Sequence, residues 1–402
     1  MSRPNGRPRL AVAVTYPIDP PRGGGQVRAF NLYRELARRF DVELVTLGLT
    51  GTREIREQLA PGLWERRVPK SDEHAAEEAR LELDAGVAVT DVAMIRLYRR
   101  TPAYVDALRD ATRGARAAVA CHPYTFPAIR EVADLPVWYE AQDVEAHLKA
   151  RILGRGKRAR TLLSDVKRVE RACCKQAEFV WACSAEDRDE LLRRYRTKPE
   201  RVLIVPNGFA LEEIRYVDPA VRREQKRRLG MTDRFLALFI ASWHDPNVVA
   251  ARRLLELAED LSSIEFLIVG SVGMALQGHR VPDNIELAGT VSSEFKQAVL
   301  SVADVALNPV TTGSGTNIKM LDYFAAGVPV ISTSFGARGL GIEAGRHYLH
   351  AEPDQLAAAL RQFRAVPIDV LDSMVRAART HVEERLSWAA IADDLLATLP
   401  SR

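Results

Sequence analysis

The sequence predicts an α/β protein that is built from two doubly wound domains. Short apolar runs alternate with amphipathic segments along nearly the whole chain, which is typical of parallel sheets wrapped by helices. At 402 residues the chain is too long for one typical hydrophobic core. The apolar runs also fall into two series, which a polar stretch after Pro206-Asn207-Gly208 separates. Together these observations predict two Rossmann-like domains that face each other across a cleft.

The first series of apolar runs defines an N-terminal domain, which we assign to residues 1–212. Its expected strands are 10–15, 42–47, 117–121, 137–140, 179–183 and 202–205. A helix is expected at 26–40, and residues 71–113 are rich in Ala, Arg, Glu and Leu and are expected to be helical. Each strand is followed by a loop or a helix start, as repeated βα units require.

The second series defines a C-terminal domain, which we assign to residues 213–386. Its expected strands are 235–241, 265–269, 285–287, 305–308 and 328–332. Helical segments separate these strands, so this half also follows the βα pattern. The remaining residues, 387–402, are expected to form a C-terminal helix that could pack back on the N-terminal domain.

Composition and charge exclude several classes of protein. The formal net charge of +4 is small for this length and does not argue for a nucleic-acid partner. The four cysteines form no C-x-x-C pair and show no metal spacing with histidine, which favours a reducing compartment. No apolar run approaches the ~18 residues of a transmembrane helix. We therefore expect a cytoplasmic protein.

The most informative motif is NPVTTGSGTNIKMLDYFAAGVPVISTSFGARGL, residues 308–340. Gly313 and Gly315 let the backbone come close to a ligand, and the free amides of the helix that follows make an anion site. Lys319 and Asp322 lie on the same helix. An anion cradle, a cation and an acid suit a nucleoside diphosphate with its ribose. The alternative is an ordinary helix start with an exposed i,i+3 Lys/Asp pair.

Two further candidates follow strands of the N-terminal domain. The triplet Gly23-Gly24-Gly25 comes after the first strand and permits close approach to a phosphate or a sugar, although it is not the dinucleotide fingerprint. His122 directly follows another strand, so its side chain is expected at the crevice where open α/β sheets bind ligands. The alternative for His122 is a capping or packing residue beside Pro123.

Three carboxylates stand at the end of a third strand. Glu140, Asp143 and Glu145 could bind acceptor hydroxyls, or could simply begin the next helix, where acids suit the helix dipole. The pair Asp187-x-Asp189 has metal-like spacing, but Ser184 caps the helix that carries it. We therefore predict no metal site.

Basic residues are concentrated in residues 151–175, RILGRGKRARTLLSDVKRVERACCK. This stretch could contact acidic lipid head groups or an anionic acceptor. The interpretation that we favour is a solvated, Arg-rich helix with i,i+3 and i,i+4 partners on its own surface.

Motifs spread over nearly the whole length resemble those of a bacterial glycosyltransferase of family 4. The resemblance rests on YPIDPPRGGGQVRAFNLYREL, CHPYTFPAI, YEAQDVEAHLK, ACSAEDRDELLRRY, VLIVPNGF, FIASWHDPN, FLIVG and GSGTNIKMLDYFAAGVPVISTSFGARGL. That family is the retaining, metal-independent group with the GT-B fold. The last motif is the most specific of the set.

The resemblance also implies roles for individual residues. His122 corresponds to the histidine near the reacting centre, Asp322 to the acid on the ribose hydroxyls, and Ser314 stands where the family places an acid against the donor sugar. The family's diphosphate-clamping Arg and Lys are replaced by the segment 242–247, so Lys319 is inferred to supply the positive charge. The implied donor-binding residues are Gly23, Gly24, Gly25, Ser242, Ser314, Gly315, Thr316, Asn317, Lys319 and Asp322.

The resemblance implies transfer of a hexosyl group from a UDP- or GDP-sugar to a hydroxyl acceptor, with no metal or other cofactor and no nucleic acid. The acceptor could be a glycan, a lipid-linked intermediate or a natural product. Peripheral contact with the inner face of the membrane would use residues 151–175. Two alternatives remain: a catalytically silent protein that binds a nucleotide sugar, and a nucleotide-sugar 2-epimerase. The sequence predicts no oligomeric state.

Overall fold

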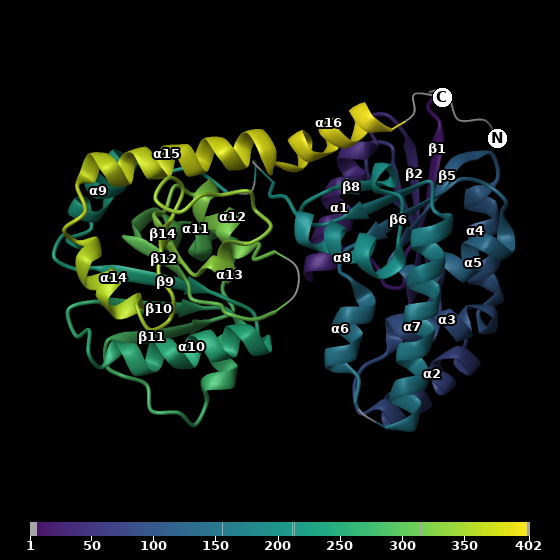
Figure 1. The fold of residues 1–402 in the computed structure, drawn as a ribbon, viewed down its shortest axis with the longest axis horizontal. Helices are drawn as coiled ribbons and strands as arrows, with labels where there is room; N and C mark the ends of the chain where they lie inside the picture. Colours follow the sequence, from purple (N-terminus) through teal and green to yellow (C-terminus); the bar gives the residue numbers. More distant parts are fainter. Residues whose placement is uncertain (1–5, 155, 211, 213, 314–315, 400–402) are drawn as a thin grey trace. The chain divides into compact units, whose positions relative to one another are not determined.

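A computed structural model of the chain describes residues 6–154, 156–210, 212, 214–313 and 316–399. The chain divides into two compact units, which are described separately below (Figure 1). Unit 1 contains Met1–Pro206 and Ile391–Arg402, and unit 2 contains Asn207–Ala390.

Unit 1 is built on an eight-stranded sheet with the order β3-β4-β2-β1-β5-β6-β7-β8. Its strands are β1 (Arg9–Ala13), β2 (Asp41–Gly48), β3 (Ile55–Ala60), β4 (Leu63–Pro69), β5 (Ala115–Cys121), β6 (Val137–Ala141), β7 (Phe179–Ala182) and β8 (Val202–Ile204). All neighbouring pairs are parallel except the antiparallel pair β3–β4. Because β1 lies between β2 and β5, the order of connections reverses there, and this switch point is where doubly wound sheets bind ligands.

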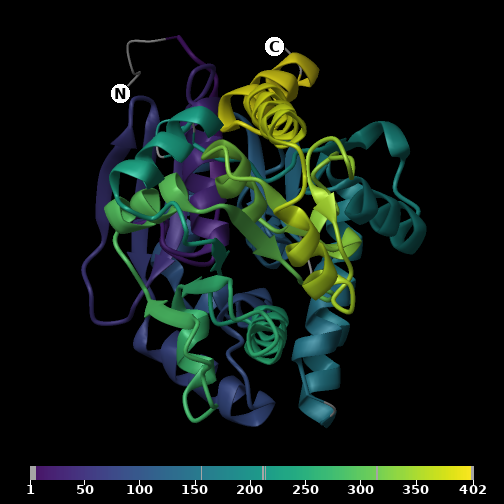
Figure 2. The same cartoon turned by 90° about the vertical axis from the view of Figure 1, so that its left-hand side faces the viewer.

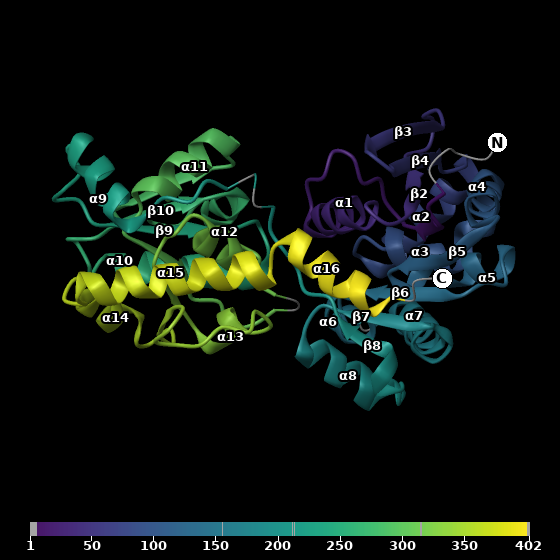
Figure 3. The ribbon, with the colours of Figure 1, turned by 90° about the horizontal axis from the view of Figure 1, so that it is seen from above.

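Helices cover both faces of this sheet. They are α1 (Gly24–Leu36), α2 (Asp72–Ala85), α3 (Thr90–Leu97), α4 (Pro102–Thr112), α5 (Phe126–Val132), α6 (Glu145–Ile152), α7 (Lys157–Gln176), α8 (Ala185–Tyr195) and α16 (Trp388–Thr398), with short 3-10 turns η1 (Tyr98–Arg100), η2 (Pro123–Thr125) and η3 (Pro199–Arg201). Figure 3 shows α1 and α16 on one side of the sheet and α4 and α5 on the other. The C-terminal helix is held there by an ion pair of Arg38 with Asp393 and by a hydrogen bond from Arg39 to the carbonyl of Leu396.

The hairpin β3–β4 is the part of the unit 1 sheet that the sequence analysis missed. Its strand β4 reads LWERRVP, and so many charges do not resemble a buried strand. The structure explains them, because the fully buried carboxylate of Glu65 accepts hydrogen bonds from the backbone of Ile18, from Thr46 and from Arg67. A buried carboxylate with this many donors is tolerated in a sheet.

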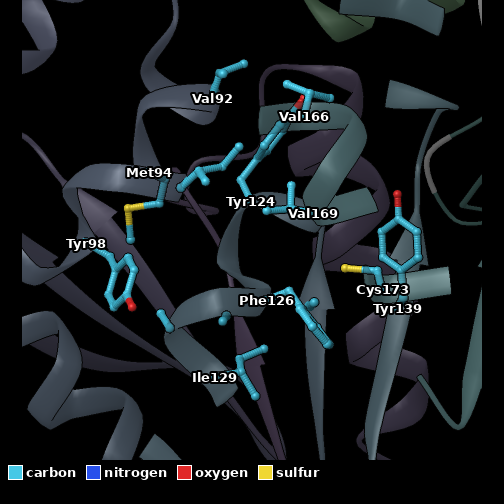
Figure 4. Close-up of a cluster of buried hydrophobic side chains, with 14 of the residues drawn as sticks. Val92, Met94, Tyr98, Tyr124, Phe126, Ile129, Tyr139, Val166, Val169 and Cys173 are labelled. Carbon is cyan, nitrogen blue, oxygen red and sulfur yellow. The ribbon is translucent and has the colours of Figure 1, made fainter. Parts of the chain in front are cut away.

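The largest hydrophobic cluster of unit 1 lies between the sheet and the layer of α3, α4, α5 and α7 (Figure 4). Alternate strand residues such as Ala11 and Ala13 of β1 contribute to it, as the period-two geometry of a strand requires. Aromatic residues fill its larger spaces, among them Tyr124, which lies near Val166 of α7 in Figure 4. This packing fixes the turn η2, which carries Tyr124, against α7.

Unit 2 is built on a six-stranded parallel sheet with the order β11-β10-β9-β12-β13-β14. Its strands are β9 (Leu236–Ile240), β10 (Glu265–Val269), β11 (Ile285–Gly289), β12 (Val305–Asn308), β13 (Val330–Ser332) and β14 (Leu349–His350). The switch point here lies between β9 and β12. Every strand expected from the sequence is present in the two units, with ends that differ by a few residues.

The helices of unit 2 also form two layers. They are α9 (Pro219–Arg228), α10 (Asp245–Ala258), α11 (Ser293–Val302), α12 (Lys319–Ala325), α13 (Ser334–Ala337), α14 (Leu356–Phe363) and α15 (Ile368–Arg385), with the 3-10 turn η4 (Ser271–Leu276). One apolar cluster joins α10 and α14 to the side chains of Ala237 and Phe239, and a second joins α11, α12 and α15 to those of Leu236 and Leu238. Figures 1 and 2 accordingly show α10 and α15 on opposite sides of the sheet.

Candidate functional site

In unit 2 the candidate residues gather at the switch point of the sheet, where Lys319 is the central side chain. Its ammonium nitrogen donates a 2.6 Å hydrogen bond to Oδ1 of Asn247 and lies 4.8 Å from the centre of the Phe239 ring. Burial lowers the pKa of Lys319 to about 7. Within the described part of the chain, no carboxylate forms an ion pair with this ammonium. The described residues therefore supply no anionic partner for this cation.

Asn247 is a residue that the sequence analysis did not single out. It lies in the first turn of α10, and its amide also donates to the carbonyl of Ser242, at 3.0 Å. The loop that replaces the expected Arg/Lys clamp is therefore tied to Lys319 through one side chain. The signal in the sequence was its place at a helix start after a central strand, where ligands bind in such sheets.

The loop between β12 and α12 is anchored by two side chains just before the helix. Thr316 accepts a 3.0 Å hydrogen bond from Asn207, and Asn317 donates to the carbonyl of Gly336 at 3.2 Å. Gly313 has a φ of +138°, and a Cβ there would lie 3.5 Å from Pro246. Ser314 and Gly315, which the sequence analysis also assigned to this site, lie outside the described residues.

Asp322 does not have the partner that the simplest interpretation expects. Its carboxylate forms a 2.5 Å ion pair with Lys296 of α11, whereas Lys319 bonds to Asn247. The i,i+3 Lys/Asp pair considered above is therefore wrong for these two side chains. Helix α12 begins at Lys319, so Asp322 lies in its first turn. Lys296 was missed because it comes from another helix.

In unit 1 the Gly triplet forms the beginning of α1 rather than a loop before it. Gly23 is the N-cap residue, and the backbone amides of Arg22 and Gly23 donate to the side chain of Gln26. Gly25 is tightly surrounded, since a Cβ there would come within 2.5 Å of the hydroxyl of Tyr16. Glycine at this position is therefore required for packing, independently of any ligand.

His122 lies at the end of β5, on the other side of the unit 1 switch point from the triplet. Its φ is +66°, a conformation that residues other than glycine rarely adopt, and strain of this kind is often found at functional sites. Its ring packs edge-on against Tyr16 and parallel to Tyr124. Its Nε2 lies 3.6 Å from a carboxylate oxygen of Glu145. Burial lowers the pKa of His122.

The three candidate carboxylates, Glu140 near the end of β6 and Asp143 and Glu145 after it, lie in different environments. Glu140 is fully buried, with one oxygen bonded to Arg28 at 2.8 Å and the other to Tyr33 at 2.5 Å. Both oxygens are occupied by protein donors, which favours a structural role for Glu140. Glu145 is also buried, and burial raises its pKa well above the ordinary value. Asp143 is partly exposed in the turn between β6 and α6.

Several further expectations concern residues away from these clusters. Ser184 caps α8 by accepting a hydrogen bond from the backbone of Asp187, as predicted. All four cysteines are buried free thiols. Among the described residues we find no group of three or more His, Cys, Asp or Glu side chains placed to hold a metal ion. The described helices also include none with the length and apolar character needed to cross a bilayer.

Comparison with protein families matches both units. The model described as Glycosyl transferases group 1 matches residues 234–365, and the model described as Glycosyl transferase 4-like domain matches residues 23–208. The first match includes Asn247, Lys319 and Asp322, and the second includes His122, Glu140 and Glu145.

Curated relatives agree with this family. A colanic acid biosynthesis glycosyltransferase, WcaL of Salmonella typhimurium, is 32% identical over 132 residues, which are 31% of this chain and 32% of the relative. A phosphatidyl-myo-inositol mannosyltransferase of Mycobacterium tuberculosis is 24% identical over 48% of this chain and 52% of the relative. The matches thus span a third to a half of these relatives. A D-inositol 3-phosphate glycosyltransferase of Streptomyces scabiei is 26% identical over 92% of this chain and 85% of the relative.

Solved structures share the fold over nearly the whole chain. HepE of Anabaena (Alr3699), in complex with UDP and glucose, has a TM-score of 0.69 at 12% identity and covers 98% of this chain and 100% of its own. Sucrose-phosphate synthase of Thermosynechococcus elongatus has a TM-score of 0.73 at 17% identity, covering 97% and 98%. The predicted GT-B fold is confirmed.

Proposed function

The chain belongs to the group 1 glycosyltransferases, and we propose that it transfers a sugar from a nucleoside diphosphate donor to a hydroxyl acceptor with retention of anomeric configuration. UDP- and GDP-sugars are the proposed donors. The named activities of the relatives, which transfer sugars to inositol derivatives or in polysaccharide synthesis, support this class of reaction. Structures of the Anabaena neighbour hold UDP and UDP-glucose, which supports a uridine diphosphate donor.

The observation that carries this proposal is the environment of Lys319. An ammonium group withdrawn from water is costly unless an anion compensates it. Lys319 has an amide oxygen and an aromatic face as neighbours, and no carboxylate pairs with it among the described residues. A diphosphate would supply the missing negative charge, and the Gly-containing loop that precedes α12 would let the phosphates approach the backbone.

The proposed mechanism is electrostatic stabilisation of the leaving diphosphate. Cleavage of the glycosidic bond leaves negative charge on the β-phosphate, and preorganised donors aimed at that charge lower the barrier. We assign this role to Lys319 together with the amides around Thr316 and Asn317. Since Lys319 supplies the compensating charge, the proposal needs no metal ion. Asp322 is proposed to hold the ribose hydroxyls.

Unit 1 contributes His122 and the Gly triplet to the proposal. We assign His122 to the reacting centre, where it would bond to the donor sugar or to the leaving group. Its strained backbone and its place at the end of β5 support this role. Gly23, Gly24 and Gly25 are proposed to approach the donor diphosphate, and the partly exposed Asp143 remains the acceptor-side candidate.

The first test is binding of donors, followed by thermal unfolding. Millimolar UDP, GDP, UDP-glucose and GDP-mannose are compared on the natural protein, on Lys319→Met, and on Lys167→Met as a control on the exposed face of α7. We expect at least one nucleotide to raise the Tm of the natural protein and of the control, because binding to the native state stabilises it. The shift should vanish in Lys319→Met. An equal shift in that variant would refute the role of Lys319.

Product analysis then separates the proposal from its two rivals. Transfer to an added hydroxyl acceptor, with NMR of the new anomeric proton showing retention, supports the glycosyltransferase. Binding without transfer or donor hydrolysis would indicate a catalytically silent protein. Conversion of the donor sugar to its 2-epimer with no acceptor present would indicate an epimerase.

We propose in addition that the basic face of α7 makes peripheral contact with anionic lipid, which would place a cytoplasmic protein at the inner face of the membrane. Arg158 and Arg168 are paired with Asp84 and Asp165. Other exposed cations of this helix have no carboxylate partner among the described residues: Lys157, Arg160, Lys167 and Arg171. Cations without partners of their own are available to lipid phosphates.

Vesicle sedimentation tests the membrane proposal. We expect binding to phosphatidylglycerol vesicles that weakens with salt and is absent with phosphatidylcholine alone. Replacing Arg160, Lys167 and Arg171 by Gln should abolish it, whereas the same number of changes at exposed arginines outside α7, Arg109, Arg227 and Arg280, should not. Equal binding by both triple variants would show that α7 is not the contact surface and that its cations are only solvated.

A further inference from the structure

His122 is surrounded by a polar cluster that four elements build. The histidine follows β5, Tyr124 comes from η2, Glu145 from the first turn of α6, and Glu170 from α7. Tyr124, Glu145 and Glu170 are buried. The sequence separates the first and last of these residues by 48 positions, so the cluster exists only in the folded chain.

The carboxylate of Glu145 connects two of its neighbours. One oxygen accepts a hydrogen bond from the hydroxyl of Tyr124, and the other lies 3.6 Å from Nε2 of His122. Tyr124 also packs parallel to the imidazole, with ring centres 6.0 Å apart and planes inclined by 14°. The same tyrosine thus anchors the carboxylate and flanks the ring that the carboxylate faces.

A second buried carboxylate fixes the position of Glu145. Helix α6 has Val144 as its N-cap residue, and valine has no side-chain oxygen to accept from the free amides of a first turn. Glu170 of α7 replaces that cap, because its two oxygens accept from the backbone amides of Glu145 at 2.7 Å and Ala146 at 2.9 Å. Tyr195 donates to Glu170 at 2.5 Å. The start of α6 is therefore held to α7 from outside.

This arrangement is not one that stability alone favours. Two buried carboxyl groups cost free energy, and apolar residues of similar volume are often as stable. Glu145 has His122 as its one basic neighbour within ion-pair distance among the described residues. The backbone of His122 is itself strained, with its φ of +66°. Both the buried carboxyl groups and the strained backbone cost free energy close to His122. These costs indicate that the orientation of the His122 ring matters for function.

We propose that Glu145 is a positioning residue for His122: its carboxyl group, held by Tyr124 and by the Glu170-capped start of α6, orients the imidazole and exchanges a proton with Nε2. The proposal rests on the role of His122 in the proposed function. The 3.6 Å between Nε2 and the carboxyl oxygen is longer than a hydrogen bond, so a protonated Glu145 donates to Nε2 of a neutral imidazole once the two groups approach in the substrate complex. When negative charge develops near the ring, that proton moves from the carboxyl oxygen to Nε2, leaving a carboxylate and an imidazolium.

The protonation states agree with this exchange. Burial raises the pKa of Glu145 and lowers that of His122, so burial favours the uncharged form of both groups. Other groups influence the pair from each packed element: Asp91 of α3, Lys149 of α6, Asp143 before α6, Glu140 of β6, Cys121 of β5, Tyr16 after β1, Tyr124 of η2 and Glu170 of α7. Lys149 is itself paired with Asp91, at 2.5 Å.

The test is NMR of the imidazole in the full chain with [13Cε1]histidine, in which the His122→Gln variant assigns one of the eight histidine signals. In Glu145→Gln we expect a changed His122 signal and a lower pKa, because the imidazolium loses the carboxylate that accepts its proton. We also expect kcat to fall by about 10- to 100-fold, the range below full loss of a general acid–base group, with donor KM nearly unchanged. Asp at this position should restore part of the activity.

Tyr124→Phe provides a second, milder variant, because it removes the hydroxyl that anchors Glu145 and keeps the ring. The matched control is Tyr98→Phe, which removes a similar hydroxyl that donates to Glu131 at 2.6 Å. Figure 4 shows Tyr98 and Tyr124 at separate places in the same apolar cluster. Only Tyr124→Phe should change the His122 signal and the acidic limb of the pH profile of kcat.

The outcomes separate this proposal from the function on which it rests. An unchanged His122 signal and pKa in both Glu145→Gln and Tyr124→Phe would overturn the positioning role, whatever the activity. A fully active His122→Ala variant would refute the assignment of His122 to the reaction, and with it this proposal. Changed NMR signals together with a lower kcat in Glu145→Gln, and no change in Tyr98→Phe, would support it.

Discussion

Glu140 in unit 1 and Lys319 in unit 2 both lie at the carboxyl edge of the sheet of their unit. Among the described residues, Glu140 has a side chain of opposite charge as its partner and Lys319 has none. Glu140 is fully buried and receives hydrogen bonds from Arg28 and Tyr33. Lys319 is partly buried, bonds to the amide oxygen of Asn247, and has no ion-pair partner among the described residues. A compensated buried charge holds the protein together, whereas an uncompensated one is available to a ligand.

The largest expected effect comes from breaking the compensated pair. Arg28→Met leaves Glu140 buried without its cation and also removes two bonds to the carbonyls of Val205 and Pro206. We expect unit 1 to lose about 3–5 kcal/mol, the usual cost of removing one partner of a buried ion pair. Urea unfolding followed by intrinsic fluorescence measures it.

A matched change at an exposed pair gives the control. Arg109→Met breaks the ion pair with Asp106, in which both side chains are largely in solvent. We expect a change within about 0.5 kcal/mol. Equal losses in the free energy of unfolding of Arg28→Met and Arg109→Met would show that burial does not increase the contribution of the Glu140 pair to stability. That result would contradict the contrast drawn between Glu140 and Lys319.

The second prediction concerns the uncompensated charge. Lys319→Ala should lower turnover by on the order of 10²-fold, the scale for losing one preorganised donor to a developing negative charge. In contrast to Arg28→Met, Lys319→Met should leave the stability of the ligand-free protein unchanged or increase it, because it removes an ammonium that has no counter-ion. Steady-state kinetics and urea unfolding measure the two effects. A Lys319→Met protein that is destabilised but has normal turnover would show that Lys319, like Glu140, stabilises the fold and does not act in catalysis.

Part of the fold and of the candidate site was predictable from the sequence. The strands, the two Gly-rich segments and His122 at a strand end were predictable because apolar periodicity and glycine placement are local signals. The switch points then follow from the order of strands. Lys319 was proposed from the sequence as the cation of a donor site, and the structure places it at the start of α12.

Partners from distant segments were not predictable in the same way. Asn247 lies 72 residues before Lys319, and Lys296 lies 26 residues before Asp322. The charged strand β4 was missed because the donors that satisfy Glu65 come from Ile18 and Thr46. Such pairs depend on which helices and strands the fold brings together. Local patterns in a single sequence do not predict these long-range contacts.

The third prediction is that donor binding depends on pH through Lys319. In the ligand-free protein the pKa of Lys319 is about 7, because burial disfavours its charged form. A bound diphosphate favours that form and raises the pKa, so above pH 7 binding must take up a proton. Donor affinity should therefore fall with rising pH, by at most tenfold per unit.

Titration calorimetry at pH 8 in buffers of different ionisation enthalpy measures the protons taken up on binding. We expect a value close to one in the natural protein. Lys319→Arg should take up none, because arginine remains charged throughout this range. Proton uptake that is identical in the two proteins would assign the titration to another group and remove Lys319 from the donor site.

The smallest expected effect belongs to an intermediate case, the ion pair of Lys296 with Asp322, whose side chains are 33% and 19% exposed. Pairs of this kind contribute little to stability, so Lys296→Gln should change it by less than about 1 kcal/mol. If Asp322 holds the ribose, however, the bond from Lys296 keeps its carboxylate in one orientation. Lys296→Gln should then reduce the preference for UDP over 2′-deoxy-UDP a few-fold, and Asp322→Asn should remove it. Arg228→Gln, which breaks the exposed pair with Glu224, is the control.

The opposite outcome is a Lys296→Gln protein that still prefers UDP over 2′-deoxy-UDP, while Asp322→Asn has lost that preference. The pair of Lys296 with Asp322 would then resemble the exposed surface ion pairs of this chain, which have little effect on function. Only charged groups withdrawn from water would then indicate functional residues.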